Sequence, residues 1–439
     1  MGASRIGSSF ARAVKSPHRL STIKDIDCPS VPTGPTTWWD RIPADCAQEW
    51  DRAVGGRSAY MSSRYLRAME GHAKVEFKFA VWQDLARPVG NQIMGVAVFQ
   101  RVQVESRAPA GHLKMGWIMR RVNSILHPGG RPFTFWVWLA GQALASGPHA
   151  HAFESGLDEP QAAARVDAAF RELSCMEAEA GRPRVAAWML KDQMPDADIG
   201  LCRMRRRGWV KLTFDPVMVV PIEPNWRQLE DWMDALRTKA RTKVKSILQR
   251  SDRVELRELD AEQAEEMSAI LYGLYCAVYD RASLVMGGLE PGDFSRLKRE
   301  LGDDFRLIAY RCDGRWVGFQ CGICEPGTGT IEAYFVGFEP SCNKELGLYQ
   351  RMLVEFVRWG LERGARRVIM GRTALEIKSG MGALPVQLTL AVRFRHPALR
   401  VLMLLGSGLF VPKPFVPRRA WRNDAAVAWE HRGPSNGYG

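Results

Sequence analysis

Two segments of the sequence repeat the same order of helix, glycine and strand. In the first half, "EPQAAARVDAAFRELSCMEAEAG" predicts a helix that ends at Gly181, and "RPRVAAWML" directly after it predicts a buried strand. In the second half, "LGLYQRMLVEFVRWGLERG" predicts a helix that ends at Gly364, and "ARRVIMG" predicts a second buried strand. A glycine just past the last helical residue commonly ends a helix. The repeated order therefore predicts an α+β protein built from two similar halves.

Further strands complete each half. "QIMGVAVFQRVQV" predicts a strand in the first half, and "RWVGFQCGIC" and "TIEAYFVGF" predict two in the second. The 439 residues are enough for two or three domains. We therefore expect a basic N-terminal tail (1–35), a first domain (36–222), a second, catalytic domain (223–432) and a disordered C-terminal tail (433–439).

A basic segment, "NWRQLEDWMDALRTKARTKVKSILQRSD", lies between the halves. Acidic residues at its start and basic residues at its end complement the dipole of a helix. Its predicted apolar stripe consists of Leu229, Trp232, Leu236, Ala240, Val244 and Ile247. Basic residues four apart on a helix repel one another, so we expect an anion along this face, with a solvated basic face as the alternative. The predicted anion-binding residues here are Arg237, Lys239, Arg241 and Lys245.

Composition indicates an anionic partner and gives little support for a metal site. The chain has 61 basic and 48 acidic residues, a net charge of +13. The nine scattered cysteines do not resemble a disulfide framework. Cys321 and Cys324 form a lone CxxC on a predicted strand, where residues three apart point to opposite faces, so we expect two core cysteines. His149 and His151 have no carboxylate pair nearby in sequence, and no metal is expected.

Two apolar segments fall short of the length of a transmembrane helix. "FTFWVWLAGQALA" covers 133–145, and "ALRVLMLLGSGLFV" covers 398–411 between basic flanks. The second suits a membrane interface, with a buried helix as the alternative. The first 24 residues hold five Lys or Arg and no acid, which fits an interfacial helix, a transit peptide or a loose tail. We expect a cytoplasmic protein that lies peripherally on the inner membrane.

The basic helix, the strand pair, the next helix and the strand that ends in "GRTALEIKSGMGA" together resemble the GNAT-superfamily N-acyltransferases of the double-domain kind. That group includes the Fem-type aminoacyltransferases and the bacterial ceramide synthases. The resemblance covers residues 85–400 and implies tandem GNAT-like domains, mixed sheets flanked by helices, with the basic helix between them. It also implies acyl-CoA as a co-substrate, with no permanently bound cofactor. "EPSCNKELGLY" replaces the family's glycine-rich loop, and the implied acyl-CoA contacts are Asn343, Lys344, Leu346 and Gly347.

Two strand ends carry the candidate chemistry. Alternation along "TIEAYFVGF" places Glu332, Tyr334, Val336 and Phe338 on one face, which offers a carboxylate base and a phenol proton donor. A glutamate on the solvent face of an edge strand is the alternative. After the strand "RRVIM", the resemblance places Arg372, Glu376 and Lys378 beside the reacting centre. Arg372 and Glu376 would pair in a helical turn, and Lys378 would hold a phosphate or polarise a carbonyl.

The leading functional hypothesis is transfer of an acyl chain from acyl-CoA to a lipid-like amine, with a sphingoid base as the favoured acceptor and an anionic membrane surface as partner. One alternative is Fem-type transfer from aminoacyl-tRNA to a peptidoglycan precursor, the only case in which a nucleic acid is expected. Another is a non-catalytic basic adaptor. The sequence has no G-x-S-x-G elbow and no GxxxxGK[ST] loop, so it does not support serine-hydrolase or P-loop chemistry.

Overall fold

The computed structural model describes six ranges of the chain, all within one compact unit, Gly34–Gly439. The predicted N-terminal tail up to residue 34, the end of the apolar segment from 407 onwards and the predicted C-terminal tail lie outside these ranges. Every helix in the described part of the chain is too short or too polar to cross a membrane. The described ranges are 35–107, 131–154, 159–194, 208–282, 284–406 and 415–422.

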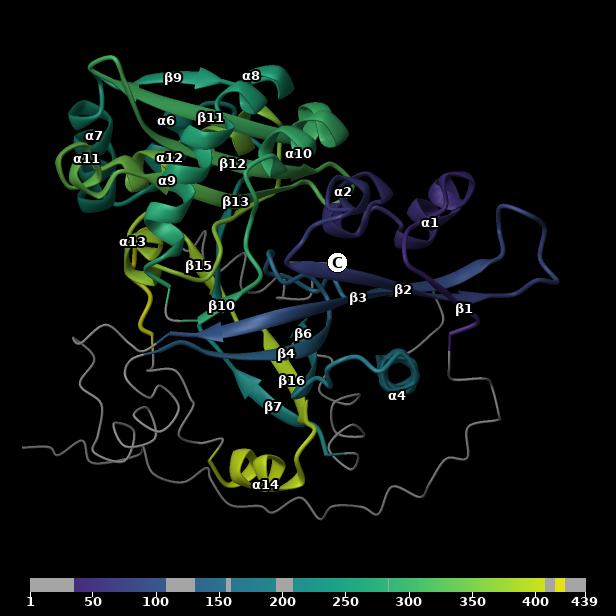
Figure 1. Ribbon diagram of the computed structural model, residues 1–439. Coiled ribbons are helices and arrows are strands. Elements are labelled where there is room, and N and C mark those ends of the chain that lie inside the picture. The colour runs from purple at the N-terminus through teal and green to yellow at the C-terminus, as the bar shows by residue number, and fades with distance from the viewer. Residues whose placement is uncertain are drawn as a thin grey trace, which may run out of the picture. The chain divides into compact units, whose positions relative to one another are not determined.

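The first sheet follows the order β1-β2-β3-β4-β6-β16-β7, and β5 and β10 also pair with β3. The pair β4–β6 is parallel and the other pairs are antiparallel. Figure 1 shows α4 beside this sheet, viewed nearly down the helix axis. The strands are β1 Thr37–Trp39, β2 Val75–Gln83, β3 Ile93–Ser106, β4 Phe133–Ala140, β5 His151–Phe153, β6 Ala187–Gln193, β7 Val210–Thr213, β10 Leu284–Met286 and β16 Thr389–Phe394.

The second sheet follows the order β15-β8-β14-β13-β12-β11-β9. Only β13 and β14 run parallel to each other. The strands are β8 Val217–Pro221, β9 Glu255–Glu258, β11 Phe305–Cys312, β12 Arg315–Glu325, β13 Thr330–Phe338, β14 Arg367–Ile369 and β15 Leu384–Val386.

The repeated order of helix and strand is confirmed in both halves. Helix α4 (Glu159–Glu179) leads into β6, and α12 (Leu348–Glu362) leads into β14. In each half the strand after the helix pairs in parallel with an earlier strand, β6 with β4 and β14 with β13. The fold is therefore α+β, with two mixed sheets flanked by helices, as the sequence predicts.

The strands do not follow the predicted division at residue 222. Strand β8 precedes that division but lies inside the second sheet, between β14 and β15. Strand β16 comes from the second half but lies in the first sheet, between β6 and β7, and β10 pairs with β3. Neither predicted half therefore holds all the strands of its own sheet.

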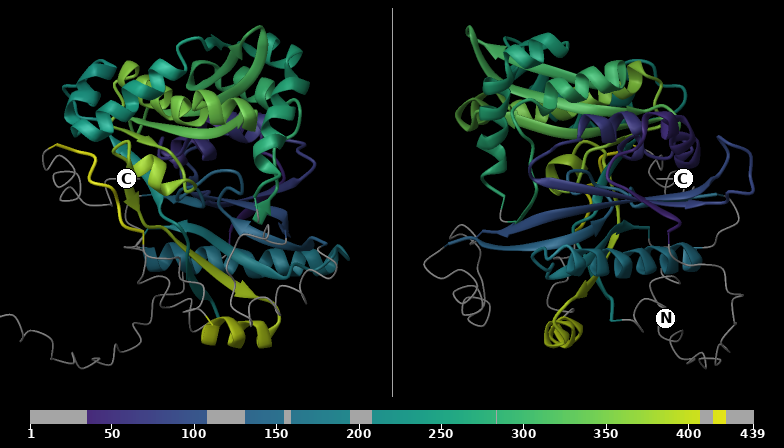
Figure 2. Two further views of the ribbon diagram at one scale, coloured as in Figure 1. Left: turned by 90° about the vertical axis from the view of Figure 1, so that its left-hand side faces the viewer. Right: turned by 45° about the vertical axis from the view of Figure 1, so that its right-hand side comes forward.

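Helices cover the faces of both sheets (Figure 2). Side chains of α4 pack on β2, β3, β4 and β6 in one cluster, and those of α1 (Ala47–Val54), α2 (Ser63–Ala68), α9 (Ser268–Tyr279) and α10 (Asp293–Leu301) form a second cluster with strands of both sheets. On the other face of the second sheet, α12 packs with α6 (Leu229–Ala235) and α7 (Thr238–Arg250). The remaining helices are α8 Ala261–Glu266, α11 Pro340–Leu346, α13 Leu375–Ser379 and α14 Pro397–Gly406.

The basic segment forms two helices, so the prediction of one continuous helix is wrong. Leu236, between α6 and α7, is extended (φ −78°, ψ 147°) and pairs with Trp421 in an isolated bridge. The N–H of Arg237 donates to the carbonyl of Ala420 at 2.7 Å, which occupies a backbone donor at the break. The predicted apolar stripe is nevertheless buried at all its positions, from Leu229 to Ile247.

The apolar segments differ in burial. Residues 133–140 form β4, which lies between β3 and β6 inside the first sheet. Residues 397–406 form α14, where the side chains of Leu399 and Val401 are 43% and 55% exposed. Exposure of these side chains is what an interfacial segment requires, and membrane association stays a prediction. Cys321 and Cys324 are buried in clusters on opposite faces of the second sheet, which confirms them as core cysteines.

Candidate active site

Strands β13 and β14 pair only at the start of β13. The parallel pairing covers Thr330–Glu332, whereas β12 pairs with β13 over nearly its whole length. From Ala333 to Phe338, β13 therefore has no strand partner on the β14 side within the described ranges. Unpaired N–H and C=O groups on such an edge can bind an extended ligand by strand addition. Glu332 lies at the point where the two strands separate.

A β-bulge re-aims the side chains of β13 just beyond this point. Cys321 faces Phe335 and Gly322 faces Ala333, so Tyr334 has no counterpart on β12. Tyr334 and Phe335 consequently both pack on the cluster shared with α2, whereas Val336 packs on the opposite side. The prediction that Val336 and Phe338 share the face of Glu332 and Tyr334 is wrong, because the extra residue reverses the alternation. Gly322 permits the bulge, since a Cβ there would lie 2.8 Å from the carbonyl oxygen of Glu332.

Tyrosines from the first half of the chain meet Tyr334. The hydroxyls of Tyr65 and Tyr334 lie 3.0 Å apart. The ring of Tyr60 lies 5.6 Å from the ring of Tyr334 and 4.7 Å from that of His149. His149 Nδ1 lies 2.8 Å from the hydroxyl oxygen of Ser58. The phenol predicted from the second half is thus part of a buried aromatic cluster to which both halves contribute.

Glu332 is buried beside this cluster, with 3% of its surface exposed, so the alternative of a solvent-facing glutamate is wrong. Its Oε2 atom has no hydrogen-bond partner of ordinary geometry in the described part of the chain. Burial raises the pKa of Glu332 well above its ordinary value, and the neighbouring Glu325 raises it further, while Lys191 and the nearby Tyr60 hydroxyl oppose the shift. A buried carboxyl with an unsatisfied oxygen and a raised pKa is typical of an acid–base catalyst.

A second bulge, in β6, turns Lys191 and Asp192 toward the same region. Gln193 faces Thr389 and Leu190 faces Ala391, so two residues of β6 oppose one of β16. Asp192 adopts a left-handed backbone conformation, with φ of 57°. Its carboxylate accepts from Lys191 Nζ at 2.5 Å and from the N–H of Gly147 at 3.0 Å.

Arg372 completes this charged group. Its guanidinium binds the other Asp192 oxygen, and it also donates to the carbonyl of Asp215 at 2.9 Å. Burial alone would raise the pKa of Asp192, but Lys191 and Arg372 bring the pKa below its ordinary value. Asp192 is therefore held as a carboxylate between two cations, a group that we call the Lys191–Asp192–Arg372 cluster.

The predicted pair between Arg372 and Glu376 is wrong. Glu376 binds Arg418 at 2.7 Å on the surface, and Arg372 binds Asp192 instead. The reason is Ala374, which has φ of 55° and starts α13 only at Leu375, so Arg372 lies outside the helix. The functional prediction for Glu376 remains untested, and its side chain is 74% exposed.

Lys378, in α13, is 2% exposed. Burial lowers its pKa from 10.5 to about 7. The described residues offer its Nζ no hydrogen bond or ion pair. A buried lysine without a carboxylate partner can exchange a proton near neutral pH, which suits the predicted catalytic role.

A large apolar cavity adjoins the Lys191–Asp192–Arg372 cluster. Its volume is about 540 Å³, within the range of small-molecule sites. Among the described residues, the charged ones that line it are Lys191, Asp192, Arg372 and Asp215. No local sequence pattern indicates this cavity, because its walls come from strands and connections scattered between residues 104 and 394. The apolar lining residues are Val104, Phe135, Leu139, Ala143, Leu144, Ala145, Met189, Leu212, Phe214, Met286, Leu390, Val392 and Phe394.

The predicted acyl-CoA loop is largely helical. Residues Pro340–Leu346 form α11, and Gly347 adopts φ of 67° between α11 and α12. Asn343 Oδ1 accepts from the N–H of Tyr349 at 2.8 Å, so this side chain caps α12. Leu346 is buried in the core, which excludes a surface contact by its side chain, while Lys344 is exposed.

A cationic group that the sequence did not single out includes Arg250, which lies close to Gly347. A Cβ at Gly347 would lie 2.9 Å from Arg250 Nη2, which shows how closely this guanidinium approaches the start of α12. Burial lowers the pKa of Lys243, and Arg418 and Arg250 lower it further. Lys243, Arg250 and Arg418 therefore form a cationic group, in which Arg418 comes from a distant part of the chain.

The predicted anion-binding residues of α7 have different surroundings. Arg237 donates to the carbonyl of Trp421 at 2.7 Å, and Arg241 pairs with Asp234 at 3.0 Å. Lys239 and Lys245 are exposed. The structure thus gives two of the four predicted cations a partner within the protein and leaves two facing solvent.

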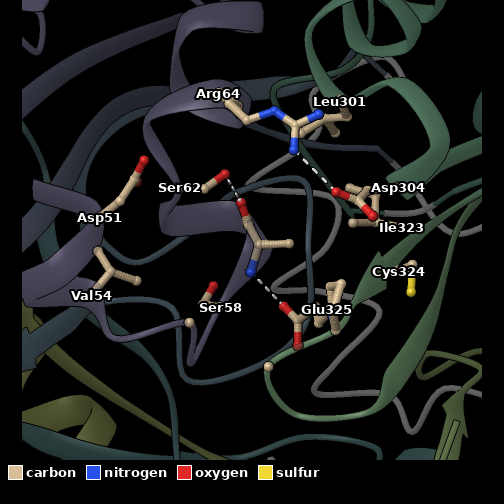
Figure 3. Close-up of a pocket in the computed structure, with 14 residues that line it drawn as sticks. Asp51, Val54, Ser58, Ser62, Arg64, Leu301, Asp304, Ile323, Cys324 and Glu325 are labelled. Atoms are coloured by element: carbon tan, nitrogen blue, oxygen red, sulfur yellow. Dashed lines mark hydrogen bonds and ion pairs between the residues drawn. The ribbon is translucent and has the colours of Figure 1, made fainter. Parts of the chain in front are cut away.

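A smaller pocket of about 160 Å³ marks where the first half meets β12 (Figure 3). Glu325 Oε1 accepts from the N–H of Ala59 at 2.7 Å, and Arg64 pairs with Asp304 at 3.0 Å. Ala59 begins the short turn Ala59–Met61, which carries Tyr60 into the aromatic cluster. Glu325 therefore connects the second sheet directly to the turn that positions Tyr60.

One group of possible metal ligands already has protein partners. His72, Glu290 and Asp293 lie close enough to share an ion. However, His72 Nδ1 accepts from the N–H of Lys74 at 3.1 Å, and Asp293 interacts with His72 at 3.2 Å and with Arg296. Because His72 and Asp293 already have these partners within the protein, we interpret the group as structural.

Part of the chain is similar to a known domain family, and the fold is similar to several solved structures. Residues 234–379 match the acetyltransferase (GNAT) domain family, and no curated protein matches the sequence. Among solved structures, FemX covers 81% of this chain and 98% of its own, at 10% identity and a TM-score of 0.47. The L-PGS structure from Bacillus licheniformis covers 65% of this chain and 87% of its own, at 14% identity and a TM-score of 0.38. The GCN5-related N-acetyltransferase from Kribbella flavida covers 60% of this chain and 83% of its own, at 15% identity and a TM-score of 0.32.

Proposed function

We propose that this protein, whose residues 234–379 match the GNAT acetyltransferase domain, is a GNAT-type N-acyltransferase that moves an acyl chain from acyl-CoA to the amine of a lipid-like acceptor. A sphingoid base is the favoured acceptor. The observation that carries the proposal is the buried carboxyl of Glu332, which has an unsatisfied oxygen and lies where β13 and β14 separate. It interacts electrostatically with Lys191 and Asp192, which line the large apolar cavity.

The donor site uses the open edge of β13. The amide groups of the pantetheine arm of acyl-CoA can pair with the free backbone groups of Ala333–Phe338, as an added strand would. Its phosphates would lie near Gly347, where Lys243, Arg250 and Arg418 supply positive charge and Lys344 is exposed nearby in sequence. The N-terminus of α12 adds partial positive charge to the same region.

The proposed chemistry begins with the amine. Glu332 as carboxylate accepts a proton from the acceptor ammonium, and the neutral nitrogen attacks the thioester carbon. The C–N bond forms, the C–S bond then breaks, and the leaving thiolate takes a proton from Tyr334. The nitrogen gives up its second proton, which returns to Tyr334 through Tyr65, whose hydroxyl lies 3.0 Å away, and Glu332 releases its proton to solvent. Lys378 in its protonated form polarises the carbonyl oxygen while negative charge develops on it.

Membrane association forms part of the proposal. The net charge of +13 and the exposed Leu399 and Val401 of α14 support a position on an anionic lipid surface, where long-chain amines are found. We propose that this surface is the cytoplasmic face of the inner membrane.

The test is product formation. Purified protein, acyl-CoA donors of several chain lengths and sphinganine are incubated and analysed by mass spectrometry. We expect an N-acyl product whose rate falls by about 10²–10⁴ in Glu332→Gln, the range for loss of a general base. Glu362→Gln, a change on the exposed end of α12, is the matched control and should keep the wild-type rate. No amide at any chain length would refute the acceptor assignment.

Aminoacyl transfer from tRNA is the second candidate. The exposed Lys239 and Lys245 and the excess of basic residues favour an RNA partner equally well. Co-purifying RNA, together with transfer activity that RNase abolishes, would select this candidate over acyl-CoA. A basic adaptor without catalysis would instead tolerate Glu332→Gln without any effect in cells.

A further inference from the structure

The large apolar cavity described above has a lining that is apolar except at one end. Resting on the proposed function, we infer that it binds the hydrocarbon chain of a single-chain amino-alcohol acceptor and holds the head of that acceptor at the Lys191–Asp192–Arg372 cluster.

The cavity follows the strands of the first sheet. Phe135 and Leu139, four residues apart on β4, both line it, and so do Leu390, Val392 and Phe394 along β16. Four residues of a strand span about 13 Å. Apolar side chains thus line an elongated space, which suits an extended alkyl chain better than a compact ring.

The polar lining is specific. Lys191 and Asp192 both line the cavity because the β6 bulge turns consecutive residues to one side, and Arg372 reaches it from the end of β14. Asp192 is an acceptor for an amine or hydroxyl donor, whereas Lys191 and Arg372 are donors for hydroxyl oxygens. A head that combines an amine with hydroxyl groups satisfies both kinds of partner. Asp192 and Lys191 also influence Glu332 electrostatically, which places such a head close to the proposed base.

The acceptor fits this site better than the acyl chain of the donor. The cavity walls belong mainly to the first sheet, whereas the cations proposed for the donor phosphates, Lys243 and Arg250, belong to α7, which packs on the far face of the second sheet. A donor acyl chain also has no charged group that would match Asp192. The amine must approach Glu332 from a side that the donor does not occupy, and the cavity offers one.

The experiment measures binding without any transfer. Saturated 2-amino-1-alkanols of increasing chain length, below their micelle concentrations, are titrated into the full chain by calorimetry. We expect the Kd to fall by about fourfold for each added methylene until the cavity is full, since each buried CH₂ contributes about 0.8 kcal/mol. Leu212→Trp fills the cavity from the edge strand β7 and should stop this gain at a shorter chain.

Leu85→Trp is the matched control, because Leu85 is 71% exposed and does not line the cavity. It should leave the whole chain-length series unchanged. Asp192→Asn should weaken the binding of amino alcohols more than the binding of alkanols of equal length. A folded Leu212→Trp protein, judged by its circular dichroism, with an unchanged series would overturn the inference.

Acyl-CoA donors of increasing chain length form the second arm. The Kd of these donors could fall with chain length, and this fall could stop at a shorter chain in Leu212→Trp. If the amino alcohols show neither effect, the cavity binds the donor and the inference is wrong. Chain-dependent binding of amino alcohols without any amide product would instead support the inference and refute the proposed transferase activity. The two failures are therefore distinguishable.

Discussion

Replacing Lys378 by methionine should stabilise the protein while it removes activity. The lysine is 2% exposed, and burial lowers its pKa from 10.5 to about 7. That difference corresponds to about 5 kcal/mol of unfavourable free energy for the charged lysine in the folded state. Methionine has a similar length and no charge, so we expect Lys378→Met to recover about 2–4 kcal/mol, the remainder being lost to imperfect packing.

The gain should depend on pH with a definite sign. Below pH 7 the lysine is protonated in both the folded and the unfolded state, and the full penalty is present. Between about pH 7 and 10.5 the unfolded chain binds more protons than the folded one, so wild-type stability from this group rises with pH. The advantage of Lys378→Met should therefore be largest at pH 6–7 and vanish above pH 10.5.

Urea unfolding at pH 6, 8 and 10 measures this difference directly, as the change in the free energy of unfolding between variant and wild type. Lys74→Met, at an exposed position, is the control and should change stability by less than about 0.5 kcal/mol at each pH. A Lys378→Met protein that is less stable than wild type at pH 6, or whose gain does not shrink as the pH rises, would contradict a buried, unpaired ammonium.

Three further predictions concern the proposed chemistry. Because the pKa of Glu332 is raised, the transfer rate of the wild type should increase with pH as this carboxyl ionises, which gives a rising limb in the pH profile. Glu332→Gln should lose this limb and recover activity only at high pH. Glu325→Gln keeps an oxygen for the N–H of Ala59 but removes a charge that raises the pKa of Glu332, so the same limb should move to lower pH; an unmoved limb would mean that another group titrates. Arg250→Ala should weaken acyl-CoA binding by about tenfold at low salt and less at high salt, as equilibrium titrations at two ionic strengths would show.

The sequence predicted elements well where local patterns decide them. The helices that end near Gly181 and Gly364, and the strands after them, follow from glycine caps and apolar periodicity, and both were confirmed. The buried stripe of α6 and α7 was confirmed for the same reason. The break between these helices was not predictable, because Leu236 takes its extended conformation from a partner, Trp421, that lies far away in the sequence.

The candidate site was predictable only in part. Glu332 and Tyr334 were identified from strand alternation, and the structure places them on one side of β13, but the same rule failed at Val336 because of a bulge. Tyr60, Lys191 and Asp192 carry no local motif. Their position beside Glu332 depends on the pairing of strands that are more than a hundred residues apart, which periodicity does not report.

The orientation of the site residues depends on the two bulges and on strands exchanged between the halves. A regular β6 would direct Lys191 and Asp192 to opposite faces, and a regular β13 would do the same for Tyr334 and Phe335. Each bulge instead turns consecutive side chains into the space between the sheets. Strand β16, which opposes the β6 bulge, comes from the second half of the chain, and β8 from the first half pairs with β14 beside Glu332. The β6 bulge is therefore formed against a strand from the other half, whereas the β13 bulge lies against β12 of its own half. A first half without β16 would lose the strand that opposes its bulge, and Arg372 also comes from the second half, so the charged cluster should form only in the intact chain.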